Sequence, residues 1–187
     1  MALTNGPSLA HNMELLRSHG ITRDHELMTK VADGPWYYQQ IDLGFNYRMT
    51  ELQAALGLSQ MSRLDDFLIR RQTLARRYDE QLSGLALSIP WQHTDVYSSF
   101  HLYVIRLSHK SRRTQVFDNL REKGIGVNVH YIPVHLQPYY QSMGFSEGDF
   151  PEAERYYSEA ISLPLFPGMS EDEHTYVIRT LKEVLQQ

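Results

Sequence analysis

The chain has 187 residues, of which 42% are hydrophobic and 21% are charged, and its formal net charge is −4. This composition is typical of a soluble globular protein, and the acidic balance argues against a nucleic-acid-binding surface in spite of clustered arginines at Arg70, Arg71, Arg76 and Arg77. The absence of cysteine excludes disulfides and thiolate metal sites, and no apolar run is long enough to span a membrane. Because MALTNGPSLAHNM also lacks the features of a signal peptide, we expect a cytoplasmic protein that binds neither nucleic acid nor membrane.

The first part of the chain predicts one helix followed by an irregular region. Residues 5–7 (NGP) are a turn signal, and Ser8 is a plausible N-cap for a helix that stops near Gly20. The hydrophobic periodicity then fails over residues 21–47. Because this stretch carries the aromatic residues 36–38, and aromatic rings are seldom left in water, we expect a structured loop that buries them.

A strong helical pattern follows this loop. Thr50 is a plausible N-cap, and apolar residues recur at helical spacing as far as Leu82, with Gly84 as a C-terminal stop. Gly57 interrupts the pattern, because glycine lowers the stability of a helix interior. We therefore expect either one long helix or two helices with a bend near Gly57.

The region after Gly84 changes character and predicts a small α+β domain. A loop is expected over residues 88–98, and FHLYVIRL (residues 100–107) and VNVHYIPV (residues 127–134) are each typical of a strand. Helices are expected over residues 114–123, 151–160 and 170–185, with an extended segment over residues 161–167. The last helix opens with a capping box formed by Ser170 and Glu173.

The loop GFNYR (residues 44–48), which precedes the predicted helix at Thr50, is the first candidate site. Asn46 offers hydrogen-bond donors and an acceptor, and Arg48 offers a planar fork that suits phosphate or carboxylate. Backbone N–H groups at the helix N-terminus would also favour an anion. The alternative, which the residues alone favour, is that Asn46 caps a turn and Arg48 forms an ordinary ion pair.

HYIPVH (residues 130–135) is the second candidate site, because residues at the end of a strand often bind ligands. Pro133 restricts the backbone beside His130 and Tyr131. The alternative is a buried aromatic ring next to a histidine whose hydrogen bonds are satisfied. His130 and His135 are too far apart on a strand, and too poorly supplied with carboxylates, to hold a metal, so we predict no metal site.

Four segments together resemble one known family. LLRSHGITRD, GFNYRMTELQAALGLSQM, REKGIGVNVHYIPVHLQPYY and AERYYSEAISLPLFPGMSEDE occur in the same order as in the DegT-type sugar aminotransferases, which are pyridoxal-phosphate (PLP) enzymes of fold type I. The resemblance covers nearly the whole chain. HYIPVHLQPYYQ is most similar to members that make 4-amino-4,6-dideoxy sugars, such as the pseudaminic-acid pathway transaminase.

The resemblance implies an α/β fold with three parts. Residues 1–45 would be the tail of the large PLP-binding domain, and residues 46–84 would form the cofactor-contact loop and a long linking helix. Residues 85–187 would form the small C-terminal α+β domain.

The resemblance also implies roles for individual residues. Asn46 matches an asparagine that reaches across a dimer interface to the cofactor phosphate, and Arg48 matches the neighbouring arginine that supports the same anionic site. Ser18 and His19 match a stretch with a positioning role. The implied partners are a second copy of the chain, a nucleotide-linked keto-sugar and an amino donor, which is glutamate in most of the family. The stretch that lines the family's sugar-nucleotide pocket matches His130, Tyr131, Ile132 and Pro133.

The chain departs from the family pattern in its catalytic residues. The lysine that forms the Schiff base, the aspartate that pairs with the pyridine nitrogen and the ring-stacking aromatic residue would all precede the segment that matches residues 1–5. No catalytic residue is therefore assigned, and because a transaminase needs that lysine, we expect the chain to be inactive alone.

Two explanations stay open. The chain is the C-terminal portion of a longer PLP-dependent enzyme of cell-surface polysaccharide or glycan biosynthesis, or it is a noncatalytic sugar-nucleotide-binding or assembly protein derived from that family. The missing strands of the large domain would leave apolar surface exposed, which predicts a homodimer or higher self-association.

Overall fold

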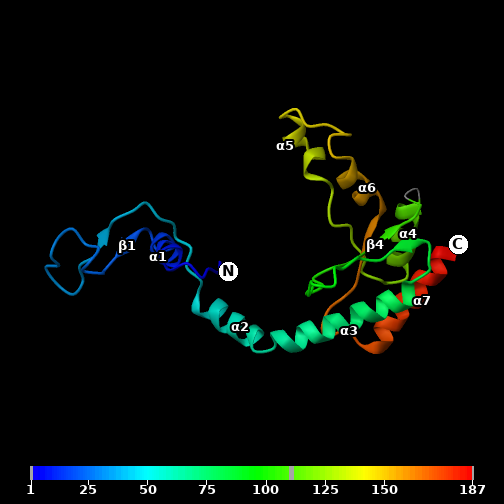
Figure 1. Cartoon of the computed structure of the whole chain (residues 1–187), viewed down its shortest axis with the longest axis horizontal. Coiled ribbons are helices and arrows are strands. Elements are labelled where there is room, and N and C mark those ends of the chain that lie inside the picture. Colours follow the sequence, from blue (N-terminus) through cyan, green and yellow to red (C-terminus); the bar gives the residue numbers. More distant parts are fainter. Residues whose placement is uncertain (1, 110–111, 187) are drawn as a thin grey trace. The chain divides into compact units, whose positions relative to one another are not determined.

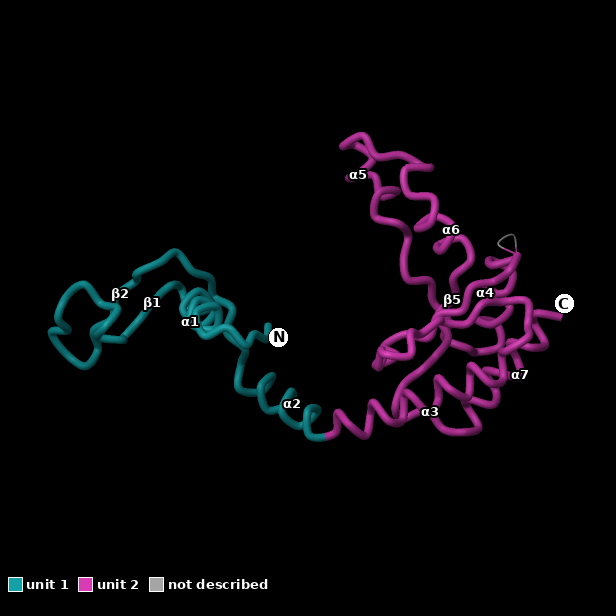
Figure 2. Tube along the Cα trace, in the orientation of Figure 1, with its two compact units in different colours: residues 1–62 teal, residues 63–187 magenta. Residues whose placement is uncertain are grey.

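The computed structural model describes residues 2–109 and 112–186, which fall into two compact units, Met1–Ser62 and Arg63–Gln187 (Figure 2). The first unit contains α1, β1, β2 and α2, and the second contains all later elements (Figure 1). Burial differs between the units. The second has a packed core, whereas Gly20 and Thr22 are the buried residues of the described part of the first.

Helix α1 (Pro7–Leu16) begins before the predicted N-cap. Gly6 is the N-cap, and it makes no side-chain capping hydrogen bond. The assignment of Ser8 as the cap is therefore wrong. The reason is that Pro7 occupies the first helical position, where its fixed φ favours helix and its missing N–H costs nothing.

The loop after α1 is closed by a short two-stranded ribbon. Strand β1 (Ile21–Thr22) pairs antiparallel with β2 (Gln39–Gln40). The prediction of a structured loop is thus confirmed, but the prediction that it buries its aromatic rings is wrong. Trp36 is 68% exposed and Tyr38 is 53% exposed, because the described part of this unit provides no apolar layer to cover them.

The segment GFNYR lies against the end of α1 through a backbone ladder. Two glycines permit this close approach. Gly20 has a φ of +69°, and a Cβ atom on Gly44 would lie 2.3 Å from the backbone nitrogen of Gly20. Three backbone hydrogen bonds join the two segments: Phe45 N–H to the Leu16 carbonyl (2.7 Å), His19 N–H to the Phe45 carbonyl (2.8 Å) and Tyr47 N–H to the Arg17 carbonyl (2.9 Å).

Gly44→Ala is expected to disrupt this ladder, because its added Cβ would lie 2.3–2.7 Å from backbone atoms of residues 16–20. In the full chain, hydrogen exchange of the Phe45 and Tyr47 amides should accelerate by about tenfold or more, which corresponds to a loss of about 1–2 kcal/mol. Gly57→Ala is the matched control. Beyond its own helix, no described atom lies within 4 Å of its added Cβ, and the change should stabilise the helix by about 0.5–1 kcal/mol. Unchanged exchange in Gly44→Ala would contradict the close packing.

The predicted long helix is divided into α2 (Glu51–Met61) and α3 (Leu64–Leu82). Of the two alternatives, the two-helix prediction is correct, but the break falls at residues 62–63 and not near Gly57. Arg63 has non-helical torsion angles (φ −111°, ψ 5°), and the Ser62 hydroxyl donates to the Ser59 carbonyl at 2.9 Å. Gly57 stays helical because an isolated glycine lowers helix stability without forbidding helical torsion angles.

Thr50 is confirmed as the N-cap of α2. The Gln53 N–H donates to Thr50 Oγ1 at 3.3 Å, and the Thr50 N–H donates to Gln53 Oε1 at 3.0 Å, which is a reciprocal capping box. No residue of α2 is buried within this chain. Its large apolar side chains, which lie on more than one side of the helix, are instead exposed: Leu52, Leu56, Leu58 and Met61.

The second unit is built on a three-stranded antiparallel sheet in the order β3–β4–β5. Helices α3 and α7 lie side by side, and α4 packs against α7 and β5 (Figure 1). The elements of this unit are α3 (Leu64–Leu82), β3 (Leu87–Ser88), β4 (Tyr103–Leu107), α4 (Arg113–Glu122), the 3₁₀ helix η2 (Val134–Leu136), α5 (Pro138–Gln141), α6 (Pro151–Glu159), β5 (Ala160–Leu163) and α7 (Glu171–Gln186).

The core of this unit lies between the sheet and the helices. Alternate residues of β4 are buried, as the two-residue period of a strand requires, whereas all four residues of β5 are buried. Helices α3, α4 and α7 supply the opposing apolar surface. The main core side chains are Leu74, Tyr78, Leu82, Tyr103, Ile105, Val116, Leu120, Ile161, Leu181 and Val184.

The predicted strand over residues 127–134 is wrong. Only Asn128 pairs, through two backbone hydrogen bonds with Ser162 of β5 (3.3 and 2.7 Å), and the chain then leaves the sheet. The third strand of the sheet is β5, which overlaps the segment predicted merely as extended. Pro133 accounts for part of this difference, because it cannot donate to a strand ladder.

The other predicted helices, over residues 114–123, 151–160 and 170–185, match α4, α6 and α7 to within one residue, whereas η2 and α5 were not predicted. At the start of α7, Ser170 N–H donates to Glu173 Oε2 (2.7 Å) and Glu173 N–H donates to Ser170 Oγ (3.2 Å), which confirms the predicted capping box. The two hydrogen bonds from Ser170, through its backbone and its hydroxyl, lower the pKa of the Glu173 carboxyl.

Candidate functional site

Asn46 and Arg48 form a hydrogen-bonded cluster with His19 on the surface of the first unit. Arg48 Nε and Nη2 both donate to Asn46 Oδ1, at 3.1 and 3.0 Å, and Nη2 lies 3.3 Å from His19 Nε2. An isolated bridge between Ser18 and Asn46 anchors the backbone of the cluster. The sequence-based alternative of an ordinary ion pair is not what the described residues show, since Arg48 contacts an amide and an imidazole.

This Asn46–Arg48 cluster presents hydrogen-bond donors. Because Asn46 Oδ1 is occupied by Arg48, the amide NH₂ of Asn46 points its donors elsewhere, and Arg48 keeps further N–H groups and its charge. Both residues are exposed. Such a donor set fits a phosphate group, which accepts hydrogen bonds from arginine and amides.

The N-terminus of α2 adds less to anion binding than the sequence suggests. The Gln53 N–H is already used by Thr50 Oγ1 in the capping box, and Glu51 places a carboxylate in the first turn. The positive character of the loop therefore comes mainly from the Arg48 side chain.

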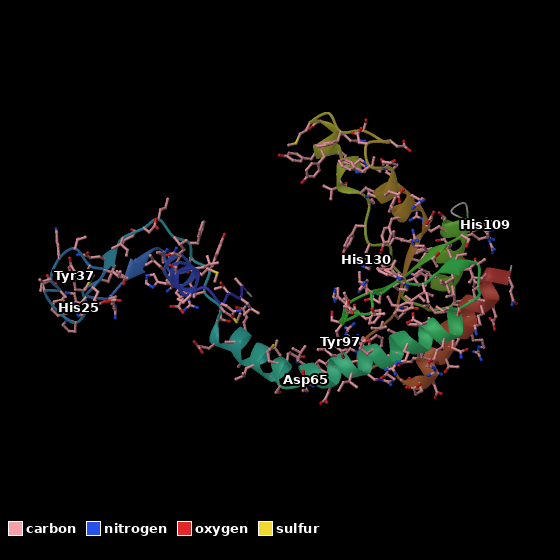
Figure 3. The ribbon with its side chains drawn as sticks, in the orientation of Figure 1. His25, Tyr37, Asp65, Tyr97, His109 and His130 are labelled. Atoms are coloured by element: carbon pink, nitrogen blue, oxygen red, sulfur yellow. The ribbon has the colours of Figure 1, made fainter. Side chains whose placement is uncertain are left out.

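His130 lies beside β5 in the second unit (Figure 3). Its Nδ1 is 2.8 Å from Ser162 Oγ, and its Nε2 is 3.5 Å from Asn128 Nδ2. The Tyr131 ring meets the imidazole edge-on with centroids 4.7 Å apart and is itself 73% exposed. The alternative of a satisfied histidine is therefore partly right, but the alternative of a buried tyrosine is wrong.

A hollow of about 420 Å³ opens beside this segment. Ile132 lines it and is 46% exposed, whereas Pro133 is buried. The guanidinium of Arg113 lies 4.8 Å above the Tyr157 ring at the same hollow. Its complete lining comprises Arg113, Thr114, Phe117, Asp118, Val129, Ile132 and Tyr157.

His135 has a structural contact and not an exposed binding face. It is 7% exposed, its Nε2 lies 2.7 Å from Glu154 Oε1, and the Gly148 N–H donates to the same oxygen. These hydrogen bonds, that from His135 first, lower the pKa of the Glu154 carboxyl. Within residues 2–109 and 112–186, no three histidine, aspartate or glutamate side chains gather as a metal site would require.

The two candidate sites belong to different units: Asn46 and Arg48 to the first, and His130–Pro133 to the second. Sequence reasoning missed the contacts of His19 with Arg48 and of Ser162 with His130. The signal available for the first contact was the family resemblance, which gave Ser18 and His19 a positioning role. No signal marked Ser162, which lies in an apolar segment far from His130 in the sequence.

The architecture is that of the fold type I sugar aminotransferases. A solved structure titled "Putative sugar aminotransferase Spr1654" from Streptococcus pneumoniae, in its PMP form, superimposes with a TM-score of 0.87 at 30% identity, over 98% of this chain and 46% of that one. Helicobacter pylori PseC, titled an aminotransferase involved in the biosynthesis of pseudoaminic acid, gives a TM-score of 0.84 at 26% identity, over 98% of this chain and 47% of that one.

The sequence comparisons agree with the fold. The DegT/DnrJ/EryC1/StrS aminotransferase family matches residues 1–182, and the chain belongs to this family. It is 38% identical to the spore coat polysaccharide biosynthesis protein SpsC of Bacillus subtilis, over 100% of this chain and 49% of SpsC. It is 34% identical to the uncharacterized protein MJ1066 of Methanocaldococcus jannaschii, over 100% of this chain and 50% of that protein. The chain thus spans about half the length of these relatives.

None of the helices in the described part of the chain has both the length and the apolar character of a membrane span.

Proposed function

We propose that this chain is the C-terminal part of a PLP-dependent aminotransferase that transfers an amino group, from glutamate, to a keto-sugar linked to a nucleotide. The product would serve cell-surface polysaccharide or glycan biosynthesis, as the name of SpsC suggests for that relative. The observation that carries the proposal is the Asn46–Arg48 cluster, a phosphate-compatible donor set in a chain of this family.

In this proposal the Asn46 amide and the Arg48 guanidinium hold the phosphate of PLP. Arg48 orients Asn46 by donating to its side-chain carbonyl oxygen, and the contact of His19 Nε2 with Arg48 Nη2 helps to hold the guanidinium in place. The bound cofactor would supply the electron sink for amino transfer. The lysine that binds it covalently would come from a part of the enzyme outside these 187 residues, so that this chain alone would not transaminate.

The segment His130–Pro133 would hold the substrate. The exposed ring of Tyr131 and the hollow beside Ile132 offer apolar surface to a sugar face, and His130 adds a polar contact. The same proposal divides the chain into the tail of the large PLP-binding domain (residues 1–45), the cofactor-contact loop with the linking helix (residues 46–84) and the small C-terminal domain (residues 85–187).

The exposed apolar residues of the first unit support assembly with other protein surface. Contiguous apolar patches of this kind mark interaction sites. We expect them to be covered in a homodimer of the complete enzyme, in which Asn46 reaches the cofactor of the other subunit. Those within residues 43–61 are Leu43, Phe45, Tyr47, Met49, Leu52, Leu56, Leu58 and Met61.

Reconstitution tests the proposal. The half of SpsC that this chain does not match would be co-expressed with the full chain and supplied with PLP, glutamate and a nucleotide-linked 4-keto-6-deoxy sugar. We expect an aminated sugar nucleotide by mass spectrometry only when both halves are present. Replacing the cofactor-binding lysine of the SpsC half by alanine should abolish it. Amination by this chain alone, or none from a co-purified complex of both halves, would refute the proposal.

A further inference from the structure

The orientation of the Asn128 side chain is set by its neighbour. Asn128 Oδ1 accepts a hydrogen bond from the Val129 N–H at 2.8 Å. Because the oxygen is used in this way, it is the NH₂ end of the amide that faces His130, with Nδ2 3.5 Å from Nε2. An amide NH₂ group only donates hydrogen bonds, so it cannot face a ring N–H favourably.

We infer that His130 is held as the neutral tautomer that carries its proton on Nδ1 and presents Nε2 as a hydrogen-bond acceptor. Nδ1–H then donates to Ser162 Oγ at 2.8 Å. The Ser162 hydroxyl can either accept or donate, so the Asn128 contact decides the assignment: the opposite tautomer would set an N–H against the Asn128 amide donors.

Ser162 is a fixed partner for this purpose. It is 4% exposed, lies in β5, and is opposite Val104 of β4 in the sheet register. On its other side it forms the two backbone hydrogen bonds with Asn128. Ser162, which contacts Nδ1, and Asn128, which contacts Nε2, are thus joined by these backbone hydrogen bonds. Ser162 and Asn128 are therefore positioning residues for His130.

The tautomer determines which ligand chemistry His130 can recognise. Nε2 has a single lone pair, so a ligand hydroxyl that donates to it would replace the long 3.5 Å contact with Asn128 Nδ2, whereas a phosphate oxygen, itself an acceptor, would be repelled. His130 therefore accepts a hydrogen bond from a sugar hydroxyl, and residues with N–H donors, such as Arg48, bind phosphate. This assignment rests on the proposed function for the ligand class, whereas the tautomer depends on the contacts within the chain.

Long-range ¹H–¹⁵N NMR of the full chain with ¹⁵N-histidine tests the tautomer. In a mildly basic buffer of about pH 8 we expect a protonated Nδ1 and an unprotonated Nε2 for His130. His130→Gln identifies the resonances by their loss. Ser162→Ala should shift the population toward the other tautomer by about fivefold or more. Ser158→Ala is the control, since that hydroxyl donates to the Arg155 carbonyl, and should leave the resonances unchanged.

Two titrations test the ligand chemistry. Methyl glucoside is expected to move the Nε2 resonance of His130, and inorganic phosphate is expected to leave it in place. An Nε2–H tautomer in the unmodified chain, a shift caused by phosphate, or no shift with the glycoside would overturn the inference. Because none of these measurements needs cofactor or amino transfer, they separate this inference from the reconstitution test of the proposed function.

Discussion

Arg48→Lys is expected to weaken PLP binding to the reconstituted enzyme by about ten- to hundredfold. The lysine keeps the positive charge but not the fork whose Nε and Nη2 both donate to Asn46 Oδ1 at 3.1 and 3.0 Å. Asn46 would then be free to turn its carbonyl oxygen toward the phosphate. Loss of a hydrogen bond to a charged group costs about 1.5–3 kcal/mol, which gives the expected range.

Equilibrium dialysis of PLP against the assembled halves measures this effect, with co-purification showing that assembly is intact. Arg23→Ala is the control, because Arg23 is an exposed arginine of the same unit outside the Asn46–Arg48 cluster. If Arg48→Lys bound PLP as tightly as the unmodified chain, the cluster would have no part in holding the phosphate.

Acidification from about pH 7 to about pH 5 is expected to destabilise the second unit through His174, by about 2 kcal/mol. His174 is fully buried (0% exposed), with its ring centroid 4.0 Å from that of Tyr78. Burial, reinforced by the charge of Arg77, lowers the pKa of His174 to about 4, although a Leu74 carbonyl and Glu171 oppose this. The unfolded chain therefore binds a proton that the folded chain does not, and stability present above about pH 6.5 is lost as the pH falls toward 4.

Urea unfolding of His174→Gln measures the effect. This variant cannot be protonated, so its stability should change by about 2 kcal/mol less between the two pH values, whatever its stability at pH 7. His109→Gln is the control, since His109 is exposed (Figure 3). Burial raises the pKa of Asp79, so this carboxyl makes the folded state more stable as the pH falls. The contribution is the same in every variant and cancels from the comparison. Equal pH dependence in His174→Gln and the unmodified chain would contradict the prediction.

Local features of this protein were predictable from the sequence. The caps at Thr50 and Ser170 are each completed by a residue three positions further on, so the motif contains the whole interaction. The α+β character of the C-terminal part also followed from periodicity. Ser8 failed as a cap for an equally local reason, because the proline before it already occupied the first helical position.

Long-range pairing was not predictable in the same way. Residues 127–134 have a stronger strand pattern than β5, yet β5 forms the strand and residues 129–134 leave the sheet. The side chains of β5 are buried on both faces, and its partners come from β4 and Asn128. A strand pattern describes a half-buried surface and contains no information about which distant segment will cover it.

The amino-acid sequence alone was sufficient for the family motifs, for the identity of the candidate residues Asn46, Arg48 and His130, and for the limits of α4, α6 and α7, because these depend on residues close together along the chain. The contacts that give those candidates their chemistry came from folding. His19 is 29 positions from Arg48, and Ser162 is 32 positions from His130. Such pairs meet only when backbone ladders bring distant segments within hydrogen-bond range, so their donors and acceptors could be assigned only after the fold was known.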